Sequence, residues 1–217
     1  MLIAFTFGFD EKFAVRSLVR HRTGKDDQVV VFLPGSQADE RTEKALTALD
    51  SFATNYLNMP EIVRHWVDVE NFYDAVSELA AFFRNTSHRP VIVNLSGGMR
   101  LLVVETLVAA ILSKMPITVE LETEDGSVYS EFDTTITQQP NLDEVDKAVL
   151  TMLSRGPASL KILAEYAEVS TTTIWRHVKR MERDGAIKVE EIKKGIIKAA
   201  PTSRARLYLA LLNTHTT

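Results

Sequence analysis

The sequence contains no cysteine among its 217 residues, so it can form no disulfide, no thiolate metal site and no cysteine nucleophile. Its five histidines are scattered, with no pair at the spacing of helical metal ligands. No apolar run approaches the roughly 20 residues that span a bilayer, and the short apolar run at residues 2–7 has no basic segment before it. We therefore expect a cytoplasmic protein that uses no metal, no cofactor and no membrane.

Two common nucleotide signatures are also missing. The Gly8-Phe9-Asp10 stretch lacks the three glycines of a dinucleotide-binding turn, and Asp10 would repel an adjacent pyrophosphate. The stretch from Ser96 to Arg100 lacks the Gly-Lys-Ser/Thr ending of a phosphate loop. No lysine stands next to Ser96 in the sequence, and no acid–base pair is evident. An NTP hydrolase and an ordinary NAD dehydrogenase are thus disfavoured, and we predict no catalytic residue.

What is present in residues 1–133 is an alternation of apolar strands and amphipathic helices. It predicts a Rossmann-like α/β domain, with a mostly parallel sheet and helices on both faces. The helix at 39–57 carries one apolar stripe, expected to be buried, formed by Ala45, Leu46, Leu49, Phe52 and Tyr56. We expect strands at 1–7, 28–33, 62–69 and 91–93, helices at 11–22, 39–57, 72–84 and 99–114, and a hairpin at 118–122 and 128–132.

The helix at 99–114 is apolar on most of its faces. This leaves two interpretations, burial within the fold or burial against a second copy of the chain.

The turn after the fourth strand is the candidate ligand site. Ser96, Gly97 and Gly98 are small enough to let a ligand approach the backbone N–H groups at a helix start, and Arg100 adds a forked cation. In such a fold the loops after the strands share one edge of the sheet. Two alternatives stay open: the two glycines serve only close packing, and Asn94 and Ser96 act as helix caps.

The charge balance differs between the two parts of the chain. Residues 141–217 contain 13 basic and 9 acidic residues, whereas residues 1–140 contain 12 and 20. An excess of positive charge suits contact with a polyanion. The polar segment 134–141 is predicted to be a linker, and residues 142–217 read as a winged helix-turn-helix domain. We expect helices at 142–153, 160–166, 171–183 and 203–212, and strands at 186–192 and 196–199.

The helix at 171–183 has two faces at 100° per residue. Ile174, Val178 and Met181 fall together and should face the core. The other face, with the wing, is predicted to contact DNA through Thr171, Thr172, Arg176, Lys179, Arg180, Arg183, Lys193 and Lys194. We expect His177 to face water or a phosphate, without a metal role, and Trp175 to pack against the core. The last helix should fold onto this domain or pair with a second copy.

The two motifs together resemble a known family. A first strand followed by Gly8-Phe9-Asp10, with Asn-x-Ser-Gly-Gly-x-Arg after the fourth strand, is similar to the CARF domains of CRISPR-associated proteins. The matching residues of the second motif are Asn94, Ser96, Gly97, Gly98 and Arg100. This resemblance implies a Rossmann-like dimer that senses cyclic oligoadenylates across its interface. Joined to a winged helix, it resembles the CRISPR-associated transcriptional regulators of archaea.

We therefore expect a homodimeric regulator that binds promoter DNA and responds to cyclic tetra-adenylate. The predicted ligand contacts are Gly8, Phe9, Asp10, Asn94, Ser96, Gly97, Gly98, Met99 and Arg100. Repeated phosphates suit paired glycine loops, and Phe9 could stack on a base. Two alternatives remain: a ring nuclease that cleaves the cyclic ligand through its own 2′-OH, and a regulator of another small anion. The sign of regulation and the promoter sequence are open.

Overall fold

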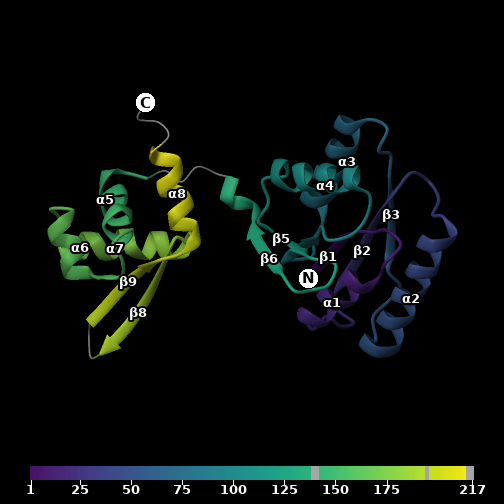
Figure 1. Ribbon diagram of the computed structural model, residues 1–217, viewed down its shortest axis with the longest axis horizontal. Coiled ribbons are helices and arrows are strands. Elements are labelled where there is room, and N and C mark those ends of the chain that lie inside the picture. Colours follow the sequence, from purple (N-terminus) through teal and green to yellow (C-terminus); the bar gives the residue numbers. More distant parts are fainter. Residues whose placement is uncertain (138–141, 194–195, 214–217) are drawn as a thin grey trace. The chain divides into compact units, whose positions relative to one another are not determined.

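The computed structural model describes residues 1–137, 142–193 and 196–213, with the side chains of 192, 193, 196, 212 and 213 not described (Figure 1). The chain divides into two compact units, residues 1–138 and 139–217. No helix in the described ranges is long and apolar enough to cross a membrane.

The first unit is the expected Rossmann-like domain. Its six strands form one sheet in the order β3-β2-β1-β4-β5-β6, and only the β5–β6 pair is antiparallel. The predicted fold class is thus confirmed. The elements are β1 (Leu2–Thr6), α1 (Lys12–Arg20), β2 (Gln28–Pro34), α2 (Glu40–Leu57), β3 (Val63–Val67), α3 (Phe72–Asn85), β4 (Val91–Asn94), α4 (Arg100–Leu112), β5 (Ile117–Glu122) and β6 (Tyr129–Asp133).

Two apolar cores lie on opposite faces of this sheet. Successive side chains of β1 point into one core and then the other. Ile3 and Phe5 pack with α1 and α2, whereas Leu2 and Ala4 pack with α3 and α4. Figure 1 shows the α1–α2 pair on one side of the sheet and the α3–α4 pair on the other. Strands covered on both faces must be apolar throughout, which explains the unbroken apolar sequences of β1, β2 and β4.

The predicted stripe of α2 is only partly correct. Ala45, Leu46 and Leu49 are buried, but Tyr56 is 76% exposed, and Ala53 is buried in this region of the helix instead. Tyr56 stacks on Phe52 at the surface, with ring centroids 5.5 Å apart. An aromatic side chain near a helix end can satisfy the 3.6-residue period and still lie beyond the edge of the core.

The start of the expected linker belongs to the sheet domain. Thr134–Thr137 forms a 3₁₀ turn, and Thr134 is buried. Its hydroxyl donates to the Met115 carbonyl at 2.8 Å and accepts from the Ile117 N–H at 3.1 Å. Polar threonines can read as a linker and still be held by backbone hydrogen bonds. The rest of the expected linker, residues 138–141, lies outside the described residues.

The second unit has the element order of a winged helix-turn-helix, as predicted. It consists of α5 (Glu144–Leu153), β7 (Ala158–Ser159), α6 (Leu160–Tyr166), α7 (Thr171–Arg183), β8 (Ile187–Lys193), β9 (Ile196–Pro201) and α8 (Ser203–Asn213). The two-residue strand β7 was not predicted; it pairs with β9 and makes the wing sheet three-stranded.

Side-chain caps fix where the two helices of the motif begin. The Ser159 hydroxyl accepts from the Ile162 N–H at 3.4 Å, and the Ser170 hydroxyl accepts from the Thr173 N–H at 3.1 Å. Each cap satisfies an N–H that has no partner within its helix. The last helix, α8, folds onto this unit, because Ala205 and Tyr208 lie in its core.

Candidate functional site

A cavity of about 720 Å³ lies at the carboxyl edge of the parallel strands. Seven of the predicted ligand residues line it: Gly8, Phe9, Asp10, Ser96, Gly97, Gly98 and Met99. They come from the loops after β1 and β4, which are neighbouring strands, although Gly8 and Ser96 are 88 positions apart in the sequence. The volume is within the range of pockets that hold small organic ligands.

The glycines are required by the close approach of these two loops. Gly98 has a φ of +88°, and a Cβ there would lie 3.0 Å from the backbone carbon of Thr6. A Cβ on Gly8 would lie 3.2 Å from the Cα of Gly98. The Thr6 hydroxyl donates to the Gly97 carbonyl at 2.7 Å and ties the loops together. The packing role that the sequence left open is therefore real.

Some backbone N–H groups of the loop have no acceptor in the described part of the protein. Within the described ranges, the N–H groups of Gly97, Gly98 and Met99 donate no hydrogen bond to the protein. These N–H groups directly precede the first turn of α4. Such a turn carries partial positive charge and suits an anionic group.

Asn94 lies behind the loop and does not line the cavity. It is buried; its side-chain oxygen accepts from the Ser96 N–H at 3.0 Å, and its amide donates to Glu120 at 3.2 Å. The Ser96 hydroxyl in turn accepts from the Glu122 N–H at 2.9 Å. The structure thus places Asn94 and Ser96 where they hold the loop, and Asn94 shapes the cavity without facing it.

Glu120 is the centre of a buried polar network beneath this loop. Its carboxylate accepts from the Ser17 hydroxyl at 2.8 Å, from the Tyr129 hydroxyl at 3.0 Å and from Arg20 at 3.4 Å, and it also contacts His21. Burial acts to raise the pKa of Glu120, but the hydrogen bonds from His21 and Ser17 outweigh it and hold this pKa below its usual value. Glu120 is therefore ionised at neutral pH.

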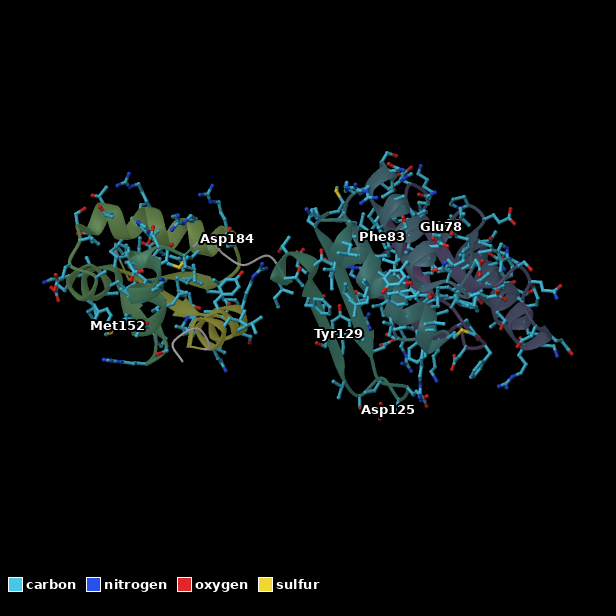
Figure 2. All side chains as sticks on the ribbon, turned by 90° about the horizontal axis from the view of Figure 1, so that it is seen from above. Glu78, Phe83, Asp125, Tyr129, Met152 and Asp184 are labelled. Carbon is cyan, nitrogen blue, oxygen red and sulfur yellow. The ribbon has the colours of Figure 1, made fainter. Side chains whose placement is uncertain are left out.

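This network could not be predicted from the sequence, because its members are spread over α1 and the residue after it, β4, β5 and β6. Figure 2 labels Tyr129 on β6 and Asp125 at the turn between β5 and β6. The register pairs Asn94 of β4 with Glu120 of β5, and strand pairing alone brings these two side chains together.

Of the predicted ligand residues Phe9 and Arg100, the first lines the cavity and the second does not. Phe9 lines the cavity and is 63% exposed, with the guanidinium of Arg41 stacked 4.4 Å from its ring centroid. Arg100 is exposed at the first position of α4 and does not line the cavity within one chain.

Several lining residues were missed. No lysine stands next to Ser96 in the sequence, but Lys12 lines the same cavity in the folded chain, and its ammonium lies 2.6 Å from the Asp10 carboxylate. Chain folding brings it there from the first turn of α1. The remaining lining residues come from the end of β2, the start of α2 and the segment between them, and from four other places in this unit: Leu33, Pro34, Gln37, Ala38, Asp39 and Thr42, then Phe7, Phe13, Trp66 and Glu124.

The second candidate surface is the outer face of α7. Ile174, Val178 and Met181 are buried, which confirms the predicted core face. The predicted residues Thr171, Thr172, Arg176 and Arg183 are exposed.

Lys179 is held on the same helix. Its ammonium bonds to Glu182 at 2.6 Å and lies 4.7 Å from the centroid of the partly buried Trp175 ring. Lys194 and the side chain of Lys193 lie outside the described residues.

Arg180 and His177 are tied to the start of α5. Arg180 contacts the buried Asp146 and lies 3.4 Å from Asp143, while the His177 Nδ1 atom lies 2.8 Å from Asp146. The expectation that His177 faces water or a phosphate is wrong; a buried carboxylate on another helix attracts it.

This group is also the one described set of side chains with metal-ligand character. Oxygen and nitrogen atoms of Asp143, Asp146 and His177 lie within 4.8 Å of one another. The guanidinium of Arg180 already occupies both carboxylates. A dication would have to displace that guanidinium, so the set fits a metal poorly.

Comparisons with known proteins agree with this architecture. Residues 1–133 match the Csa3 CRISPR-associated Rossmann-like domain, and residues 146–197 match an HTH domain. The chain is 27% identical over 192 residues to the CRISPR locus-related protein Csa3 of Saccharolobus solfataricus, named for a proposed DNA-binding role; the match covers 87% of this chain and 76% of that protein.

Solved structures are similar over a smaller part. RV1404 from Mycobacterium tuberculosis is 26% identical with a TM-score of 0.34, and the match covers 37% of this chain and 58% of the RV1404 chain. The transcriptional regulator BldR from Sulfolobus solfataricus is 23% identical with a TM-score of 0.33, and the match covers 36% of this chain and 58% of the BldR chain. This chain therefore spans less than two thirds of either one.

Proposed function

The chain belongs to the family of the Csa3 CRISPR-associated Rossmann-like domain, and from this premise we propose that it is a CRISPR-associated, DNA-binding transcriptional regulator. We further propose that the sheet domain receives a cyclic oligoadenylate, cyclic tetra-adenylate in the first instance. The observation that carries the ligand proposal is the cavity at which the loops after β1 and β4 meet. No step of this function requires a metal or a cofactor.

DNA binding is supported by α7. Arg176 and Arg183 are exposed on the face opposite the core, and α6 and α7 stand in the order of a helix-turn-helix. Such a helix places side chains against base edges and phosphates. Arg176→Ala should weaken binding of DNA from the CRISPR locus in gel-shift titrations, whereas Arg84→Ala, an exposed arginine on α3, should not. Equal behaviour of the two variants would count against α7 as the reading helix.

Ligand binding is supported by the donor groups of the loop. The free N–H groups of Gly97, Gly98 and Met99 suit a phosphate, and Lys12 adds a cation to the cavity. Calorimetric titration of the full chain with cyclic tetra-adenylate tests this step. Saturable binding supports it; binding of a simple anion such as phosphate or sulfate but not of the cyclic nucleotide would favour the alternative of another small anion.

A homodimer is supported by the outer surface of α4. Leu101, Val104 and Leu112 are 42, 48 and 54% exposed, with the partly exposed Val108 on the same side. An apolar stripe of this kind on a polar protein marks an interaction site, and the same stripe on a second copy is complementary across a two-fold axis. The stripe begins beside Arg100, so pairing about a two-fold axis near the start of α4 would bring two loops and two Arg100 side chains together. Sedimentation velocity measures the mass directly.

Cleavage of the ligand is the second candidate, and the specific observation in its favour is Lys12. A cation beside the loop could stabilise charge on a phosphate during attack by the neighbouring 2′-OH. The close Asp10 carboxylate, 2.6 Å from this ammonium, offsets that charge, so we rank binding without turnover first. Chromatography of cyclic tetra-adenylate after incubation with the protein distinguishes the two, since steady production of linear oligoadenylate would show an enzyme.

A further inference from the structure

We propose that the end of the cavity beside β2 and β3 is an adenine subsite, in which the exocyclic amino group of one base donates a hydrogen bond to Asp39. This inference rests on the proposed cyclic oligoadenylate ligand and deepens it, because it assigns a residue that selects the base. The argument uses the order of the strands, the charges along the cavity and the chemistry of the lining residues.

The cavity has two ends of different chemistry. Its glycine loops follow β1 and β4, at the middle of the sheet, whereas Gln37 and Asp39 follow β2, and Trp66 lies on β3. The strand order β3-β2-β1-β4 therefore places the backbone N–H donors of the β4 loop in one part of the cavity and Gln37, Asp39 and Trp66 in another. A nucleotide has the same division, with an anionic phosphate and a flat base rich in hydrogen-bonding groups.

The charge at the β2 end disfavours a phosphate there. Asp39 is the charged lining residue at this end, whereas Asp10 and the single lining cation, Lys12, follow β1, and Glu124 lies in the turn after β5. That cation lies 2.6 Å from Asp10, so no lysine or arginine among the lining residues offsets Asp39. Arg41, which does not line the cavity, acts on the pKa of Asp39 less than the Thr42 hydrogen bond does. A phosphate beside Asp39 would meet like charge, whereas a group with N–H donors would be attracted.

Asp39 caps the start of α2 as a charged carboxylate. One carboxylate oxygen accepts from the Thr42 N–H at 2.7 Å as the helix cap. This hydrogen bond lowers the pKa of Asp39. A carboxylate offers about four acceptor positions, so the cap leaves acceptor capacity for a ligand. The carboxylate is also held in place by the helix that it caps.

The neighbouring side chains suit a purine. Trp66 is partly buried and presents an aromatic surface, against which a base can stack. The amide of Gln37 offers one donor and one acceptor, the pair that binds the N6 and N7 edge of adenine. Hypoxanthine carries a carbonyl oxygen in place of the amino group of adenine, and its N1 atom carries a hydrogen. That oxygen would face the carboxylate of Asp39 and be repelled.

The test compares two ligands on three proteins. Cyclic tetra-adenylate and its inosine counterpart, which lacks the amino groups, are titrated by calorimetry into the unmodified chain, Asp39→Asn and Glu40→Gln. Asparagine caps a helix as well as aspartate does, and it can turn its amide to donate to a carbonyl. Glu40 is the matched control: it loses the same charge one residue away, pairs with Lys44 at 2.7 Å and does not line the cavity.

We expect the unmodified chain and Glu40→Gln to prefer the adenine ligand by about tenfold to a hundredfold, the range for a hydrogen bond to a charged group. Asp39→Asn should lose most of this preference while its melting temperature stays the same. Equal preference in all three proteins, with tight binding of cyclic tetra-adenylate, would overturn the subsite and leave the proposed function standing. No binding of either ligand would overturn both.

A third ligand separates the base from the sugar. Carboxylates near the end of a second strand can also accept from a ribose 2′-OH. If Asp39 binds the base, the Kd of Asp39→Asn divided by the Kd of the unmodified chain should be the same for the 2′-deoxy form of cyclic tetra-adenylate as for the ribose form. If Asp39→Asn instead loses discrimination against the 2′-deoxy form, Asp39 holds the sugar, and the adenine assignment is wrong.

Discussion

Replacement of Glu120 by Gln tests whether the buried network beneath the loop holds the site in place. Glutamine keeps the shape and an acceptor oxygen, but it removes the charge that faces Arg20 and His21. Breaking a fully buried ion pair costs about 3–5 kcal/mol. Because Arg20 and His21 are partly exposed, we expect a smaller loss, about 2–3 kcal/mol, which corresponds to a fall in melting temperature of about 6–10 °C for a domain of this size.

The assay is calorimetric unfolding of the full chain, with Glu131→Gln as the control. Glu131 also accepts a hydrogen bond from the Tyr129 hydroxyl but is exposed, so its loss should cost less than about 1 kcal/mol. Ligand affinity should fall in Glu120→Gln as well, because Asn94, which orients the Ser96 N–H, loses its charged partner. A melting temperature within about 1 °C of the unmodified chain, with unchanged affinity, would refute the reasoning.

The same variant has a defined pH dependence. The pKa of Glu120 is lowered in the folded state from its ordinary 4.5, despite burial that acts to raise it. A lowered pKa gives stability that is complete above the unfolded value and is lost as the pH falls through the folded value. The stability gap between the unmodified chain and Glu120→Gln should therefore be full at pH 7 and shrink below about pH 4.5. A gap that is unchanged in acid would contradict the assignment of charge to Glu120.

Three further predictions concern the loop, the reading helix and the dimer. Gly98→Ala should lose more than about 1 kcal/mol and weaken ligand binding, because a Cβ there would lie 3.0 Å from backbone at a φ of +88°; an unchanged melting temperature would contradict this. Asp143→Asn removes one carboxylate from Arg180 and should tighten DNA binding in gel-shift titrations by about twofold to fivefold. Glu144→Gln removes the same charge from the neighbouring residue, which has no contact with Arg180, and should tighten DNA binding less. Equal effects of the two variants would mean that only the net charge of the domain matters and not the contact with Arg180. Val104→Asp places a charge on the exposed stripe of α4 and should give a monomer in sedimentation velocity, whereas an unchanged mass would place the interface elsewhere.

Much of the fold could be predicted because local chemistry and global packing agree. The predicted helix at 171–183 has the same limits in the structure, since Ser170 caps its start and Gly185, with a φ of +70°, follows its end. The parallel sheet follows from strands that are apolar throughout and alternate with helices. The strand β7 was missed because two residues give no periodicity, and it exists only through its pairing with β9.

The site could be predicted in part, because strand–turn–helix sequences place their loops at one known edge. Gly8 and Gly98 were found through this rule, and the structure brings them into contact. Asn94 was expected at the ligand because it belongs to the Asn-x-Ser-Gly-Gly-x-Arg motif. Its contact with Glu120 could not be predicted, because Glu120 is 26 residues away and is brought beside it only by strand register. Asp39 was missed because it reads as an ordinary helix cap, and nothing in the sequence places it on the cavity wall.

As the proposed ligand-responsive regulator, the chain should bind DNA through its winged helix with an affinity that changes when the sheet domain binds a nucleotide. Direct coupling is measured by titrating labelled DNA from the CRISPR locus with the full chain, with and without saturating cyclic tetra-adenylate. We predict a change in the Kd for DNA of about fivefold or more, and an equal factor in the Kd for the ligand when DNA is present, because such coupling is reciprocal. Saturable binding of the ligand with an unchanged Kd for DNA would contradict the claim.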